Sequence, residues 1–120
     1  MQLNLDELKS NFPLETLRTL LHRSLQQISN DATHFQGAIG ARDFVHAGQL
    51  IHRTRGLALF LGVPAVMLDP IQATENELIA QTTRASPSNL DVERVVIQFN
   101  ILTLELGALL TKASKEIDAA

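Results

Sequence analysis

Residues 13–40 read PLETLRTLLHRSLQQISNDATHFQGAIG, and this stretch indicates the fold most directly. Its apolar residues recur at steps of three and four, the spacing that places side chains on one side of an α-helix. These positions are Leu14, Leu17, Leu21, Leu25, Ile28, Ala32, Phe35 and Ile39. Pro13 suits the first turn of a helix, and Gly37 and Gly40 break the pattern at the other end. The stretch is therefore predicted to form one long helix with a single buried stripe.

The segments on either side of this stretch show helical patterns with recognisable ends. A short helix is predicted to begin at Asn4, which can cap it together with Glu7 three positions later. A longer helix is predicted from Phe44 to Leu61, with Asp43 as its N-cap. Gly62 then stands where a left-handed residue commonly ends a helix. Two helices are thus expected to flank the long one.

The last third of the chain predicts two more helices joined by a loop. Asp69 is a candidate N-cap followed by a proline in the first turn, and this helix should reach about Arg84. Residues 85–88 are expected to form the loop, and Ser88 with Asp91 forms a capping-box pattern. The final helix has apolar residues at helical spacing, namely Val92, Val95, Val96, Phe99, Leu102, Leu106, Leu109, Leu110 and Ala113.

The sequence as a whole predicts a single all-α domain over residues 1–120. Five helical segments and no strand are expected, arranged as an antiparallel four-helix bundle with a short additional N-terminal helix. A length of 120 residues is that of one ordinary domain, and 45% hydrophobic residues are enough for a folded core.

Composition also narrows the classes of function and location. The chain has no cysteine, so it has no disulfide and no thiolate metal site, which fits a cytoplasmic location. A formal net charge of -3 argues against non-specific nucleic-acid binding. No apolar run approaches the roughly 20 residues that span a bilayer, and the N-terminus lacks the basic and apolar regions of a signal peptide. Neither nucleic-acid binding nor membrane insertion is expected.

The predicted helix from residue 44 to residue 61 carries the candidate functional site. At about 100° per residue its apolar side is clear, and His52 points away from that side. Gly48 and Gly56 lie one turn before and one turn after the histidine, and each costs a helix about 1 kcal/mol relative to alanine. They are interpreted as leaving the imidazole open to a large partner. The residues expected to contact that partner are Val45, Gln49, Arg53, Leu59 and Phe60.

Arg55 lies on the same side of the helix as His52, three positions later. A guanidinium there would attract a phosphoryl group and hold its oxygens. A neutral imidazole is the nucleophile needed to attack an acyl phosphate. The pair therefore favours phosphoryl chemistry, with His52 as acceptor and Arg55 as an electrostatic helper.

The run His52-Arg53-Thr54-Arg55-Gly56, followed by Gly62, resembles the signature of histidine phosphotransfer (HPt) domains. Their pattern is H-x-x-K-G with a second glycine six residues after the first. The resemblance implies that His52 takes a phosphoryl group from a receiver-domain aspartate and passes it to another receiver. It places Arg55 where the family has lysine, and Gly56 where a glycine keeps the histidine accessible. The implied partners are the receiver domains of response regulators or of a hybrid sensor kinase.

No cofactor of its own is expected for this chain, and any Mg²⁺ should belong to the partner receiver. No P-loop or other nucleotide motif is present, so the chain is expected to be a phosphoryl acceptor and donor that cannot phosphorylate itself from ATP, and not an enzyme. His22, His34 and His46 form no metal-binding pattern, and Glu75 and Glu77 are interpreted as part of a solvated helix face. Two alternatives stay open: a helical module that binds a protein partner without phosphate, and, more remotely, a helical enzyme or metal protein.

Overall fold

The computed structural model describes residues 1–83 and 90–120, and both ranges are helical with no strand. The prediction of an all-α fold is therefore confirmed. The predicted end of the fourth helix at Arg84, the loop at 85–88 and the cap at Ser88 lie outside the described residues. The elements are α1 (Leu5–Asn11), α2 (Leu14–Gly40), α3 (Phe44–Phe60), a 3₁₀ turn η1 (Ala65–Leu68), α4 (Asp69–Thr83) and α5 (Val92–Asp118).

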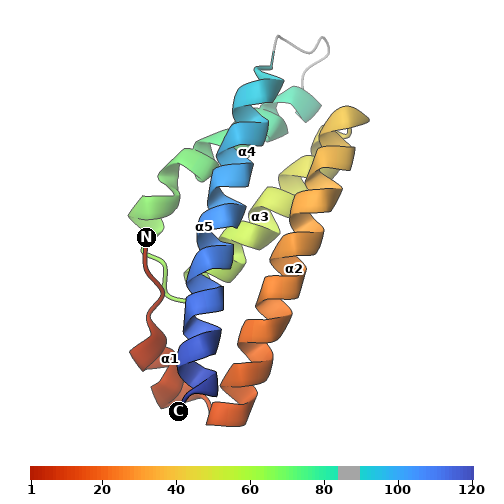
Figure 1. Cartoon of the computed structure of the whole chain (residues 1–120). Coiled ribbons are helices and arrows are strands. Elements are labelled where there is room, and N and C mark those ends of the chain that lie inside the picture. The colour runs from red at the N-terminus through yellow and green to blue at the C-terminus, as the bar shows by residue number, and fades with distance from the viewer. Residues whose placement is uncertain (84–89) are drawn as a thin grey trace.

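The four longer helices pack side by side, and successive ones run in opposite directions (Figure 1). The two longest, α2 and α5, lie against each other, while α3 packs between α2 and α4. The short α1 packs against α2 at the end of the bundle where the chain also finishes. Inside the bundle, the rings of Phe35 and Phe99 lie 4.2 Å apart between their centroids and join α2 to α5.

Side-chain caps fix where three of the helices begin. The Asn4 side chain accepts a hydrogen bond from the Glu7 backbone N–H at 3.2 Å, as predicted. Asp43 likewise accepts from the backbone N–H of His46 at 3.1 Å and starts α3 at the predicted residue. Asp91 itself caps α5, accepting a hydrogen bond from the backbone N–H of Arg94 at 3.0 Å, rather than serving as the third helical position of a capping box.

The start of α4 differs from the prediction. Asp69 is not an N-cap, because its φ of -56° and ψ of -43° are already helical. The 3₁₀ turn η1 runs directly into α4, and its last residue, Leu68, is buried. Pro70 is tolerated so early in α4 because the first turn of a helix needs no N–H donor at that position. The chain therefore becomes helical one turn earlier than its cap and proline pattern indicates.

Gly62 lies where the end of α3 packs against Asn4, the residue just before α1. Its φ is +94°, as the predicted left-handed position requires. A Cβ added there would lie 2.5 Å from the Cβ of Asn4 and 2.8 Å from its backbone nitrogen. The Asn4 N–H also donates to the carbonyl oxygen of Leu61 at 3.1 Å. Glycine thus permits both the turn and the close approach of the N-terminal segment.

Replacing Gly62 by alanine should destabilise the protein by at least about 1–2 kcal/mol, the cost of a left-handed conformation for a residue with a Cβ. The clash with Asn4 adds to this cost. Gly37→Ala is the matched control, because Gly37 lies within α2 and nothing is within 4 Å of an added Cβ. That variant should be as stable as the wild type or more stable. Urea unfolding of the three proteins measures both changes, and equal midpoints for wild type and Gly62→Ala would contradict this account of the turn.

Candidate functional site

The exposed side of α3 presents His52 to solvent. The histidine side chain is 70% exposed, while the helix residues on the opposite side, among them Leu50 and Ile51, are buried. This is the orientation that the apolar pattern of α3 predicts. The imidazole is therefore open to a partner of any size that can reach this face of the bundle.

The structure places a buried carboxylate directly beside this histidine. Glu75, on α4, has a side chain only 7% exposed, and its Oε2 lies 3.3 Å from His52 Nδ1. Its other oxygen, Oε1, accepts a hydrogen bond from Arg55 Nε at 3.3 Å. The interpretation of Glu75 as part of a solvated face is therefore wrong, because α4 turns this residue toward α3. Its neighbour Glu77 is instead part-exposed and pairs with Arg94.

The contacts of His52 Nδ1 indicate which ring nitrogen carries the proton when the imidazole is neutral. Nδ1 has two neighbours, Glu75 Oε2 at 3.3 Å and Arg55 Nη2 at 3.2 Å, and a neutral ring cannot donate to one and accept from the other at once. Glu75 Oε2 is buried, and a buried acceptor without a donor is costly, whereas Arg55 is already bonded to Oε1. We therefore assign the proton to Nδ1, donating to Glu75. The lone pair then lies on Nε2, the other ring nitrogen.

The two glycines that flank His52 have different roles. Gly48 is buried, and a Cβ added there would meet the Cβ of Leu78 on α4 at 3.9 Å. It was expected to be an exposed position that leaves access, and the structure instead shows it in the contact between α3 and α4. Gly56 is exposed, and nothing lies within 4 Å of an added Cβ. The open space predicted beside the histidine is therefore found one turn after His52, at Gly56.

A groove of about 450 Å³ begins at His52 and follows the line between α3 and α4. Most of its wall is apolar, and Val45 and Ile79 are each about half exposed on it. Its lining residues are Phe44, Val45, Gly48, Gln49, His52, Glu75, Ile79 and Thr82. Two of the residues expected to contact a partner, Val45 and Gln49, thus share one surface with the histidine.

The other two apolar residues expected to contact a partner lie past Gly56, at the far end of α3. Leu59 and Phe60 are exposed and line a separate hollow beside α1. The ring of Phe60 lies 6.1 Å from that of Phe12, between centroids. A partner that covers His52 would need to extend over Gly56 to reach them.

Arg53 lies on the opposite flank of α3 and contacts α2. Its guanidinium pairs with Asp31, a fully buried carboxylate that also accepts a hydrogen bond from Thr54 Oγ1 at 3.2 Å. The hydrogen bond to Asp31 raises the pKa of Arg53 above its ordinary value. Arg53 therefore links α3 to α2, although about half of its side chain stays exposed.

The remaining histidines lie apart from this site. The Nε2 of His22 is 3.9 Å from a carboxylate oxygen of Asp118 near the C-terminus, and His34 and His46 are exposed. Within residues 1–83 and 90–120, no group of three or more histidine and carboxylate side chains is close enough to hold a metal ion. The chemistry of the described site is thus that of one imidazole, one carboxylate and one guanidinium.

The assignment of the His52 proton predicts a measurable tautomer. In the wild type, neutral His52 should carry its proton mainly on Nδ1, and Glu75→Gln should reduce that fraction because the hydrogen bond loses its charge assistance. Long-range ¹H–¹⁵N correlation spectra of the imidazole rings report the tautomer directly. Exposed His34 is the internal control and should be the same in both proteins. A wild-type His52 with its proton on Nε2 would show that Arg55, not Glu75, is the partner of Nδ1.

No family model, curated protein or solved structure matches this chain. The nature of the site is therefore inferred from its own geometry. That geometry consists of an exposed histidine oriented by a buried carboxylate, a neighbouring arginine, and an apolar groove that begins at the ring.

Proposed function

We propose that this chain carries a phosphoryl group on Nε2 of His52, as a phosphotransfer module acting between receiver domains. The observation that carries the proposal is the exposed imidazole whose Nδ1 is hydrogen-bonded to the buried carboxylate of Glu75. The resemblance of residues 52–56 to the HPt signature supports the same function. An all-helical fold with the histidine on an exposed helix face is consistent with it.

The chemistry follows from the proton on Nδ1. The Nε2 lone pair attacks phosphorus in the acyl phosphate of a receiver aspartate, a P–N bond forms, and the P–O bond breaks to release the aspartate carboxylate. The ring keeps its Nδ1 proton and becomes positively charged. Glu75 lies 3.3 Å from Nδ1, where its negative charge stabilises this product and the transition state that leads to it. The reverse attack by a second aspartate returns the imidazole to its neutral form.

Arg55 and Gly56 have supporting roles in this proposal. The guanidinium of Arg55 is fixed beside the ring by Glu75, and its positive charge attracts the phosphoryl oxygens. Gly56 leaves open space next to the imidazole, which the in-line approach of a receiver active site requires. Mg²⁺ and the acidic residues that hold it are assigned to the receiver.

A second candidate function uses the same surface without phosphate. The groove beside His52 is mainly apolar, with Val45 and Ile79 exposed on it, and such a surface can bind a partner helix on its own. In that case His52 would be one polar contact among apolar ones. The two functions differ in whether the histidine becomes covalently modified.

The direct test uses wild type and His52→Gln with a phosphorylated receiver domain. The wild type should gain phosphate that is lost in acid, and the variant should gain none, because glutamine has no ring nitrogen to form a P–N bond. Receiver binding, measured separately by calorimetry, should survive in the variant. If both proteins bind and neither is labelled, the domain is an interaction module. If the variant is labelled as strongly as the wild type, His52 is not the acceptor.

Gly56→Leu should slow phosphoryl transfer by about a hundredfold, because displacing the reacting groups by about 1 Å is enough for such a loss. The fold should be retained, since leucine has a better helix propensity than glycine and the space is open. Gly37→Leu is the matched control on α2, and it should transfer at the wild-type rate. Quench-flow measurement of labelled His52 gives these rates, and an unchanged rate for Gly56→Leu would remove the role given to this glycine.

A further inference from the structure

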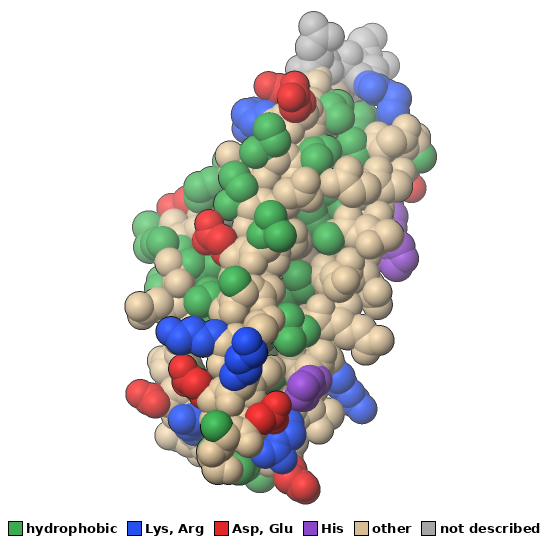
Figure 2. All heavy atoms as spheres, in the orientation of Figure 1, with side chains coloured by type: hydrophobic (Ala, Val, Ile, Leu, Met, Phe, Trp, Pro, Cys, Tyr) green, Lys and Arg blue, Asp and Glu red, His purple; other side chains and the backbone are tan. Residues whose placement is uncertain are grey.

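Helix α5 has apolar residues on its solvent side as well as on its core side. Its core side is buried against the rest of the bundle through Val95, Phe99, Leu102, Leu106, Leu110, Ala113 and Ile117. Directly opposite lie Ile97, Ile101 and Leu104, which are 48%, 46% and 73% exposed, followed by exposed Ala108. Figure 2 shows hydrophobic side chains along the part of α5 that faces the viewer. We refer to these four exposed residues as the outer stripe of α5.

The outer stripe has the spacing of a helix–helix seam. Its residues follow one another at steps of four, three and four, an average of about 3.7, so they form one nearly straight ridge along α5 against which another helix can pack. The outer face of a bundle helix is ordinarily polar. Both sides of α5 are apolar. For this reason α5 alone among the described helices has the length and composition that could cross a membrane. Its core side, however, is already used inside the bundle, so the outer stripe is the part that lacks a partner.

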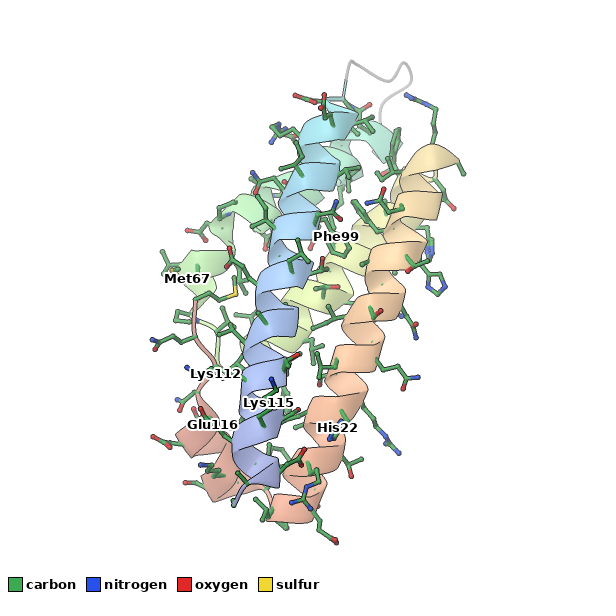
Figure 3. All side chains as sticks on the ribbon, in the orientation of Figure 1. His22, Met67, Phe99, Lys112, Lys115 and Glu116 are labelled. Atoms are coloured by element: carbon green, nitrogen blue, oxygen red, sulfur yellow. The ribbon has the colours of Figure 1, made fainter. Side chains whose placement is uncertain are left out.

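Charged residues at the two ends of the outer stripe have opposite signs. Exposed Glu93 lies one turn before Ile97, and exposed Lys112 lies one turn after Ala108. Neither has an ion-pair partner within the described part of the chain. Figure 3 labels Lys112 and Lys115 toward the C-terminal end of α5. Among the described residues, the stripe therefore has an unpaired glutamate at its start and an unpaired lysine at its end, while Arg94, next to Glu93, is already paired with Glu77.

This charge pattern is complementary to itself in one orientation. When two copies of α5 cross antiparallel about a point midway between residues 102 and 103, Ile101 meets Leu104 and Ile97 meets Ala108. The same register sets Glu93 of each copy against Lys112 of the other. A parallel pairing would instead oppose glutamate to glutamate and lysine to lysine, which is unfavourable.

We propose that the outer stripe of α5 binds a second copy of this chain, forming an antiparallel two-fold dimer. Such an interface is isologous, so each contact occurs twice. One helix from each copy forms the seam, which places the interface in the small class, below about 1,200 Å², and makes the dimer weak and reversible. His52 lies in the groove between α3 and α4, whereas the outer stripe is on the solvent side of α5, so His52 stays outside this interface. The dimer would therefore hold two phosphotransfer sites that remain accessible.

Sedimentation equilibrium of the full chain tests the proposal. The wild type should show a monomer–dimer equilibrium with a dissociation constant in the micromolar range, and Leu104→Glu should be monomeric. Leu104 is 73% exposed, so this variant should fold like the wild type by circular dichroism. A wild type that is monomeric up to about 1 mM would overturn the proposal. If such a monomer sedimented with phospholipid vesicles and Leu104→Glu did not, the stripe would be a lipid-binding surface instead.

Charge reversal tests the register. Glu93→Lys and Lys112→Glu should each weaken the dimer by roughly tenfold, since each turns two attractive charge pairs into repulsive ones. The double variant Glu93→Lys/Lys112→Glu should recover most of the wild-type affinity. Glu116→Lys makes the same charge change off the outer stripe and should leave the dissociation constant unchanged. If the double variant is no tighter than the single ones, the antiparallel register is wrong.

Discussion

The buried carboxylate of Glu75 is the group on which the candidate site depends. A carboxylate in a helix contact is costly unless donors surround it, and α3 supplies them as the N–H groups of Arg55 and His52. The orientation and tautomer of the histidine follow from that requirement. The buried carboxylate of Asp31, on α2, also needs a donor, and Arg53 on the other flank of α3 provides it. The helix that carries the histidine is thus held on both sides by buried carboxylates from its neighbours.

Most of the fold follows from local sequence features. Apolar residues at steps of three and four predict the helices, and Asn4 and Asp43 mark two of their starts because capping needs only a few adjacent residues. The left-handed conformation of Gly62 was predictable in the same way. The exposure of His52 was predictable too, since its angle from the apolar face of α3 is a property of one helix. These features need no knowledge of how the helices contact one another.

The parts that the sequence did not reveal depend on the contacts between helices. Gly48 looks like an exposed glycine on α3 alone, and it is buried because Leu78 of α4 packs over it. Glu75 looks solvated beside Glu77, yet it lies in helical register with the buried residues Ile71 and Leu78. That register was a usable signal: a charged residue on an apolar stripe must find a partner on a neighbouring helix. Asp31, between Ile28 and Phe35 on α2, carried the same signal.

We assign different roles to two surfaces of the bundle. One contains His52 and the groove between α3 and α4, and the other is the outer stripe of α5. The central claim concerns the first, that Nε2 of His52 carries the phosphoryl group while Nδ1 stays bonded to Glu75. Nitrogen–phosphorus coupling in ¹⁵N-histidine-labelled phosphoprotein tests this claim most directly. The account predicts coupling to Nε2 of His52, and coupling to Nδ1, or phosphate on a different residue, would contradict it.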